Sequence, residues 1–355
     1  MELTQSNRFE RIMTTIKDVA QAAGVSTSTV SLTFASPDRV SPGTAERIWK
    51  AADALGYRPN PLAQNLKRGR SRMIGVLVGD ISSPFFGRFL KVVEKRVWER
   101  DYLMIVADTD GDPARELDLL EQFDSQRIAG ILLSPHGGGV EYGQRLGSFQ
   151  TPIVTVDHRS REAALDYVGS DSRMAARMLT DHMINMGHRR IAQITGPIQL
   201  YTASERLQGY LEAYHAAGMH VDDSLIVDGR YQDTESYAQT MRLMTRPDRP
   251  TAVLAASNMM ALGALQAIQE LGYSCPRDVS LATIDDIPWS SVIKPRLTTV
   301  LQDIETIAKI SADYLLDRIE TLGSKKIPAR ETILMPRLSL GTSTTPPQLD
   351  VVQTE

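Results

Sequence analysis

Cysteine is almost missing from the sequence, since Cys275 is the only one among 355 residues. A single cysteine excludes a disulfide within the chain and fits a reducing compartment, so we interpret Cys275 as a structural residue. No apolar run approaches the length of a membrane-spanning helix, and the polar N-terminus is untypical of a secretory signal. We therefore expect a cytoplasmic protein without a membrane partner.

Motifs for common catalytic chemistries are missing as well. The sequence has no G-x-S-x-G, no H-E-x-x-H and no G-x-x-x-x-G-K-[ST], which argues against a serine hydrolase, a zinc site and a P-loop nucleotide hydrolase. Residues 136–139, HGGG, are similar to an esterase oxyanion loop, but without the nucleophile motif they indicate a glycine-rich turn. Residues 108–112, DTDGD, are similar to a calcium loop, but Pro113 occupies the position that requires glycine. We predict no enzyme activity, no metal and no cofactor.

Positive charge is slightly outnumbered overall, with 39 Lys and Arg against 43 Asp and Glu, but it is in excess at one end of the chain. The formal net charge is −4, yet residues 1–70 carry +4 and the remaining residues −8. A basic segment on an acidic body concentrates the attraction for phosphate at the N-terminal end. Charge clustering alone does not distinguish a nucleic-acid surface from an ordinary solvated one.

What is present at that end is a series of short helical patterns over residues 15–67. Thr15 can cap a first helix that ends at Gly24, and Ser26 can cap a second. Two helices joined by a tight glycine-containing turn form the helix-turn-helix signature, whose second helix enters the DNA major groove. A third helix spans residues 41–56. We expect a small core from apolar residues of all three helices: Val19, Val30, Phe34, Ile48 and Leu55.

From residue 73 onward, apolar strand patterns alternate with amphipathic helices, which predicts parallel sheets covered on both faces. Two α/β lobes with a ligand cleft at the carboxyl ends of their strands are the economical arrangement. The expected strands are 74–78, 103–107, 128–133, 152–156, 191–195, 251–255, 279–284 and one near 332–340. The expected helices are 85–99, 113–126, 172–186, 204–217, 259–271 and 304–322.

Domain boundaries follow from these changes of pattern. We predict a flexible leader over 1–13, a helix-turn-helix domain over 14–59, a hinge helix and linker over 60–72, a bilobed effector-binding and dimerisation domain over 73–341, and a flexible tail over 342–355. The fold class is thus an all-α head followed by a body of two doubly wound parallel-sheet lobes.

Several segments in this order resemble the LacI/GalR family of bacterial transcription regulators: TIKDVAQAAGVSTSTVS, VSPGTAERIWKAADALGYRPN, PLAQNLK, IGVLVGDISSPFF, MALGALQAIQELG, DVSLATIDD and PRLTTVLQD. The resemblance covers roughly residues 15–340. It implies a periplasmic-binding-protein-like body, a homodimer, a pseudo-palindromic operator, a small effector, and a nucleoid-associated protein of the bacterial cytoplasm.

The same resemblance assigns DNA-reading positions. Thr27, Ser28 and Leu32 fall on the base-contacting positions, where many relatives have Arg in place of Leu32. Phosphate contacts fix register without reading sequence. Residues assigned to the phosphates or to the ends of the reading helices are Thr15, Ser26, Thr29, Ser31, Arg39 and Tyr57. In the hinge, Leu66 would wedge apart the central base step, with Asn60, Ala63, Gln64 and Lys67 lining the minor groove.

Motif matching also implies an effector site. Patterning alone favours ordinary core packing for Phe85, Phe86 and Tyr231, and only the resemblance moves them to a pocket. The expected effector residues are Phe85, Phe86, Asp157, His158, Thr202, Arg206, Tyr231, Ser257, Asn258, Asp285 and Trp289.

The effector that we favour is a sugar or sugar derivative. Purine-responsive relatives have a basic residue where this chain has Leu200, which argues against a purine. The leading hypothesis is an effector-controlled, sequence-specific repressor. The alternatives are a sugar-binding protein and a sugar-modifying enzyme that uses Asp157 and Asp285 in the same cleft.

Overall fold

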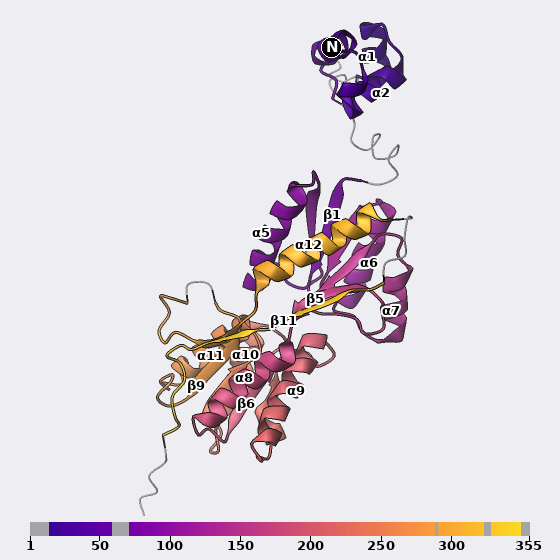
Figure 1. Ribbon diagram of the computed structural model, residues 1–355. Helices are drawn as coiled ribbons and strands as arrows, with labels where there is room; N and C mark the ends of the chain where they lie inside the picture. Colours follow the sequence, from indigo (N-terminus) through magenta and orange to yellow (C-terminus); the bar gives the residue numbers. More distant parts are fainter. Residues whose placement is uncertain (1–13, 59–70, 288–289, 323–327, 349–355) are drawn as a thin grey trace, which may run out of the picture. The chain divides into compact units, whose positions relative to one another are not determined.

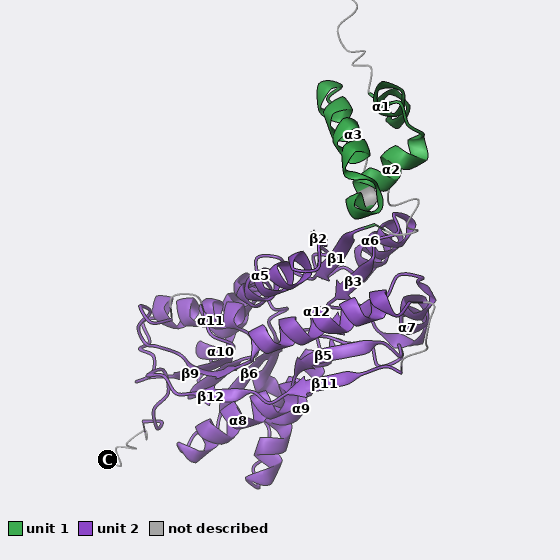
Figure 2. Cartoon of the chain, turned by 45° about the horizontal axis from the view of Figure 1, so that its top comes forward, with its two compact units in different colours: residues 1–71 green, residues 72–355 purple. Residues whose placement is uncertain are grey.

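The computed structural model describes residues 14–58, 71–287, 290–322 and 328–348. The chain divides into two compact units, residues 1–71 and residues 72–355 (Figure 2). The predicted leader and most of the predicted hinge, including Asn60, Ala63, Gln64, Leu66 and Lys67, lie outside the described residues.

The first unit is the helical head. Its helices are α1 (Ile16–Ala23), α2 (Thr27–Ala35), the short 3₁₀ helix η1 (Pro37–Arg39) and α3 (Pro42–Ala54). Gly24 ends α1 in the left-handed region at φ 66°, which permits the tight turn into α2. Val19, Val30 and Ile48 are fully buried, as the sequence predicted.

Two members of the predicted head core differ from expectation. Leu55 is 39% exposed because α3 ends at Ala54, so that Leu55 serves as its C-cap rather than as a core residue. Phe34 is only half-buried and packs edge-on against Trp49, with ring centroids 4.6 Å apart. The head core is therefore completed by small residues of α1 and α3, among them Ala20 and Ala52.

The second unit contains two lobes (Figure 1). Each lobe is built on a six-stranded sheet, and the two sheets have equivalent strand orders. The N-lobe sheet has the order β11-β5-β4-β3-β1-β2, and every pair is parallel. Its strands are β1 (Met73–Val78), β2 (Leu103–Asp108), β3 (Gly130–Leu133), β4 (Ile153–Val156), β5 (Asp166–Ser170) and β11 (Glu331–Leu334).

The C-lobe sheet has the order β12-β10-β9-β8-β6-β7, and all pairs except β10–β12 are parallel. Its strands are β6 (Ile191–Thr195), β7 (Ile226–Asp228), β8 (Ala252–Ala255), β9 (Ser280–Ile284), β10 (Thr298–Leu301) and β12 (Arg337–Ser339). The predicted fold class is confirmed.

Helices cover both faces of each sheet, because the central strands are apolar on both sides. In the N-lobe, α5 (Pro84–Trp98) and α12 (Ile304–Glu320) pack on one face, and α6 (Pro113–Ser125) and α7 (Gly139–Ser148) on the other. In the C-lobe, α8 (Ser172–Asn185) and α9 (Tyr201–Ala216) lie opposite α10 (Asp233–Met244) and α11 (Asn258–Glu270).

The chain passes between the lobes three times: from β5 to α8, from β10 to α12, and from β11 to β12. The strand that we predicted near residues 332–340 is therefore two strands in different sheets, separated by Met335 and Pro336. Strands β5, β7 and β10 and helices α7 and α10 were not predicted. Their short or polar patterns gave no clear period. Pairing with neighbouring strands fixes the three strands, and packing against the sheets holds the two helices.

The prediction of a flexible tail from residue 342 is wrong for residues 342–348. Ser343 is fully buried, donates a hydrogen bond to the Leu281 carbonyl (2.5 Å) and accepts one from the Thr298 amide (2.8 Å). Thr345 is joined to Ser280 on β9, since its amide donates to the Ser280 hydroxyl at 3.0 Å. The polar composition of this segment indicated a tail, but its hydroxyls and amides hydrogen-bond to the C-lobe.

Candidate functional site: an interlobe cleft and a reading head

A cleft of about 370 Å³ opens between the two lobes of the second unit. Loops from the carboxyl ends of strands in both sheets form it, as expected for doubly wound folds. It is lined by Gly79, Asp80, Ser83, Phe85, Phe86, Asp110, Gly111, His136, Asp157, His158, Pro197, Gln199, Leu200, Thr202, Arg206, Arg230, Tyr231, Gln232, Ser257, Asn258, Met259, Asp285 and Gln302. Every predicted effector residue except Trp289, which lies outside the described residues, is in this set.

Two carboxylates enter the cleft from equivalent places in the two lobes. Asp157 follows β4 and Asp285 follows β9, and both have left-handed backbone, at φ 60° and φ 65°. Burial raises the pKa of Asp157 to about 6, although the Arg206 charge opposes this rise. Burial also raises the pKa of Asp285, whose carboxylate accepts hydrogen bonds from the Gln302 amide (3.3 Å) and side chain (2.7 Å).

Arg206 supplies the buried positive charge of the cleft. It lies on α9, is 5% exposed, and donates through Nη1 to the Ala256 carbonyl at 2.7 Å. Its buried Nε has no hydrogen-bond partner among the described residues. The guanidinium carbon lies 5.9 Å from the centre of the Tyr231 ring. Arg206 therefore keeps donor capacity for a ligand beside two carboxylates.

A hydrogen bond across the lobes borders the cleft. The Thr202 amide of the C-lobe approaches Nδ1 of His158 in the N-lobe at 3.4 Å, and the Thr202 hydroxyl lies 3.1 Å from the same nitrogen. The Thr202 hydroxyl also lies 2.9 Å from the Tyr231 hydroxyl. Burial, together with His136 and Arg206, holds the pKa of His158 well below its usual value, so this ring is neutral.

The remaining predicted effector residues line the cleft and also make contacts within their own lobes. Phe85 and Phe86 are each 7% exposed, with ring centroids 5.1 Å apart, so core packing and cleft lining both apply. Ser257 caps α11 by accepting from the Met260 amide, and Asn258 donates to the Asp286 carbonyl at 3.1 Å. The polar groups of Ser257 and Asn258 are thus engaged within the C-lobe. Contact of all these residues with an effector stays a prediction.

Sequence reasoning missed several cleft residues, notably Asp80, Asp110, His136, Arg230 and Gln302. Each follows a strand of one of the two sheets, which is the signal that could have found them. Asp110 and Arg230 occupy matching turns after β2 and β7, at φ 55° and φ 51°. Because strands β7 and β10 were not predicted, the loops after them could not be assigned to the cleft from the sequence.

In the head, the predicted base-contacting residues Thr27 and Ser28 lie exposed on the first turn of α2, and Leu32 one turn later is half-buried. The Ser26 hydroxyl caps α2 by accepting from the Thr29 amide at 3.1 Å, and it lies 2.8 Å from the Thr29 hydroxyl. Among the predicted phosphate contacts, Thr15 is exposed before α1 and Arg39 is exposed in η1. Ser31 is half-buried on α2, and Tyr57 packs against Phe34.

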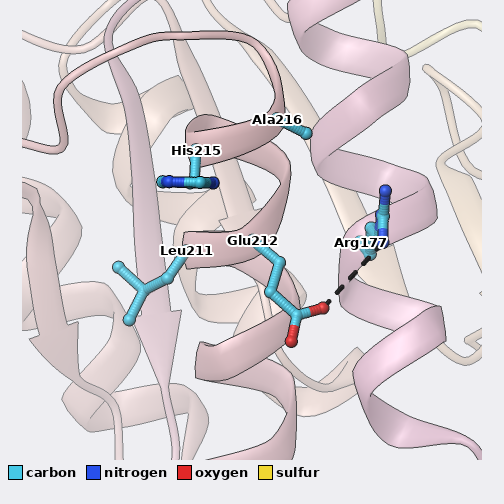
Figure 3. A pocket seen from close by; sticks show the side chains of 5 residues that line it. All are labelled: Arg177, Leu211, Glu212, His215 and Ala216. Carbon is cyan, nitrogen blue, oxygen red and sulfur yellow. Dashed lines mark ion pairs between the residues drawn. The ribbon is translucent and has the colours of Figure 1, made fainter.

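A separate depression lies between α8 and α9 (Figure 3) and shares no lining residue with the cleft. Arg177 on α8 and Glu212 on α9 point toward one another across it, 4.0 Å apart. An exposed ion pair of this kind is typical of a solvated helix surface, and we assign no function to it. None of the helices in the described residues is both long and apolar enough to cross a bilayer.

A helix-turn-helix head followed by a bilobed receptor with a cleft defines a ligand-responsive regulator. Residues 15–60 match the model of bacterial regulatory proteins of the lacI family, and residues 180–344 match a periplasmic binding protein-like domain. The ribose operon repressor of Escherichia coli (strain K12) is 33% identical over 310 residues, which are 86% of this chain and 93% of the repressor.

Solved structures of transcriptional regulators have the same fold as this chain. The transcriptional regulator CelR in complex with cellobiose is 30% identical, with a TM-score of 0.70 over 93% of this chain and 99% of that one. The lac repressor dimer bound to operator and the anti-inducer ONPF is 25% identical, with a TM-score of 0.80 over 94% of this chain and 99% of that one. The chain belongs to the lacI family and is a DNA-binding transcriptional regulator.

Proposed function

We propose that the cleft binds an unphosphorylated sugar and that this sugar controls how tightly a homodimer of the chain binds a pseudo-palindromic operator, as a repressor in the bacterial cytoplasm. The observation that carries the proposal is the buried Arg206, which interacts electrostatically with two carboxylates of opposite lobes, the buried Asp285 and the 13% exposed Asp157. Carboxylates and an arginine together suit the paired hydroxyls of a sugar, which both donate and accept hydrogen bonds.

The charge of the cleft supports an uncharged ligand. Asp80, Asp110, Asp157 and Asp285 outnumber the two cationic side chains, Arg206 and Arg230. A phosphate would bring further negative charge into a site with an acidic excess, and like charges at this range repel. The faces of Phe85, Phe86 and Tyr231 provide the apolar surface on which a sugar ring can lie.

The names of two relatives indicate which sugars to test first. One is named as a ribose operon repressor and another was solved with cellobiose. A cleft of about 370 Å³ lies at the small end of ligand pockets, which favours a mono- or disaccharide. Because the cleft lies between lobes, a sugar that contacts both lobes stabilises one arrangement of them and shifts the operator-binding equilibrium.

In the head, we propose that Thr27, Ser28 and Leu32 contact base edges and that Thr15, Ser26, Thr29, Ser31, Arg39 and Tyr57 contact or support contacts to phosphates. In the hinge, Leu66 is proposed as the minor-groove wedge, with Asn60, Ala63, Gln64 and Lys67 beside it. We propose that the cleft binds its ligand without converting it, so a bound sugar is recovered unchanged.

A thermal-shift screen with ribose, cellobiose and their phosphorylated counterparts tests the proposal. A sugar at 100 times its Kd stabilises the folded chain by about 2.7 kcal/mol, which raises Tm by several degrees. The Arg206→Ala variant should lose the shift. The matched control is Arg277→Ala, which removes an exposed arginine paired with Asp278 and should keep it. Stronger shifts with phosphosugars than with sugars would contradict the proposal.

A further inference from the structure

The loop after β3 holds a histidine at the cleft in a fixed position. The amide of His136 donates to Oε2 of Glu116 at 3.0 Å, and Glu116 is fully buried on α6. The Tyr142 hydroxyl of α7 donates to the other oxygen of the same carboxylate. The HGGG segment, which the sequence indicated only as a turn, is therefore anchored from behind by a buried carboxylate.

The hydrogen bonds of the ring define its tautomer. Nδ1 of His136 lies 3.0 Å from the Ser134 carbonyl oxygen, and a carbonyl oxygen can only accept. Nδ1 therefore carries a hydrogen, and in the neutral ring Nε2 has a free lone pair. No described residue hydrogen-bonds to Nε2, and this nitrogen is not among the buried atoms without a partner. The free acceptor thus reaches the space of the cleft that the ring lines.

The surroundings of the ring leave it little freedom. A Cβ atom on Gly79 would lie 2.1 Å from Cε1 and 2.3 Å from Nε2 of His136, so only glycine leaves room for the ring there. The ring packs edge-on against His158, with centroids 5.2 Å apart. The His136 side chain is 12% exposed. A ring that is held on three sides, with one acceptor directed to the cleft, is preorganised to bind a donor.

We propose that His136 Nε2 accepts a hydrogen bond from one hydroxyl of the bound sugar and so determines which sugars the cleft accepts. This inference rests on the proposed function and names a specificity residue within it. A site built around a fixed acceptor rejects an analogue that lacks the matching hydroxyl, because the acceptor is then left unpaired in a dry pocket.

Isothermal titration of the full-length protein with ribose, and with cellobiose as second probe, measures the effect. His136→Leu removes the acceptor at similar size and should weaken binding roughly tenfold. His136→Gln keeps an acceptor and should recover part of that loss. His215→Leu, on α9 away from the cleft, is the matched control and should bind as the parent does.

A second pair of variants separates contact from folding. Gly79→Ala should push the ring aside and weaken binding as His136→Leu does. In the double variant Gly79→Ala with His136→Ala, the new methyl group occupies room that the ring has left, so thermal stability should recover while sugar binding stays weak.

Deoxy analogues of the bound sugar identify the contact. The parent should discriminate against one deoxy analogue, and that discrimination should vanish in His136→Leu, which a purely structural role would not cause. If His136→Leu binds and discriminates as the parent does, the inference is overturned while the proposed function stands. If neither sugar binds the parent, the proposed function fails and this inference with it.

Discussion

Asp157 and Asp285 occupy equivalent positions at the ends of β4 and β9, each in left-handed backbone and each in electrostatic contact with the buried Arg206. Two carboxylates in one cleft repel each other, and the Asp285 charge contributes to the raised pKa of Asp157. Strained backbone and a costly charge at matching places in both lobes are typical of a site arranged for a ligand rather than for stability.

The first prediction concerns Asp157 and pH. Its pKa is about 6 in the folded chain against 3.8 ordinarily, so ionisation destabilises the fold as pH rises between these values. Asp157→Asn should therefore increase the free energy of unfolding at pH 8, by up to about 3 kcal/mol, and the gain should shrink to less than about 1 kcal/mol near pH 4. Urea unfolding of the sugar-free protein at both pH values measures this.

The Asp157→Asn variant should also bind sugar at least tenfold more weakly. A variant that is more stable and binds sugar equally well would contradict a ligand role for Asp157.

A second prediction concerns contacts between the lobes outside the cleft. The Arg159 and Arg161 guanidinium carbons of the N-lobe lie 4.7 Å and 5.5 Å from the Tyr201 ring centre of the C-lobe, and Arg161 pairs with Glu205 at 2.5 Å. Cation–π contacts and ion pairs of this kind contribute on the order of 1 kcal/mol each. Tyr201→Ala should weaken sugar binding roughly three- to tenfold without touching the sugar, because the lobes are held less firmly.

Titration calorimetry on Tyr201→Ala checks this, with Tyr237→Ala as the control. The Tyr237 hydroxyl on α10 donates a hydrogen bond to Glu270 on α11 within the C-lobe, and Tyr237 is not one of the residues that line the cleft. Unchanged sugar affinity in Tyr201→Ala would mean that these contacts do not favour the ligand-binding arrangement.

A third prediction concerns the segment after β12. Ser343→Ala leaves the Thr298 amide and the Leu281 carbonyl without their buried partner, which should cost about 1–3 kcal/mol of unfolding free energy. Gln348→Ala, at an exposed position, should cost nothing measurable. Thermal unfolding of the two variants compares them directly, and equal Tm values would show that the segment adds no stability.

The fourth prediction separates base reading from phosphate contact in the head. Ser28→Ala on the exposed first turn of α2 should change which operator sequences bind best. Arg39→Ala should weaken binding to all duplexes alike and reduce the magnitude of the salt slope by about one. A binding-site selection at fixed salt, followed by titrations over a salt series, distinguishes these outcomes. A changed sequence preference in Arg39→Ala would contradict its assignment.

The fold was largely predictable because local patterns encode it. The caps at Thr15 and Ser26 and the turn at Gly24 are properties of neighbouring residues, and the structure places them as expected. Central strands such as β1 and β8 are apolar throughout because both of their faces are buried, and such runs stand out in a sequence.

The cleft was predictable only in part. Arg206 and Asp285 lie in motifs that the family resemblance located, and the structure brings them together. His136 could not be assigned, because its role depends on Glu116 on α6, on Tyr142 on α7 and on the missing side chain at Gly79. These residues are separated in sequence and meet only when α6, α7 and the N-lobe sheet pack together.

By itself, then, the sequence determined the three-helix head, the alternation of strands and helices, and the regulator family, because periodicity and capping depend on residues a few positions apart. Only the tertiary structure decided that the residues around 335 divide between two sheets, that Ser343 is buried against β9 and β10, and which side chains complete the cleft. Those outcomes depend on pairing between distant segments, which local patterns of hydrophobicity do not record.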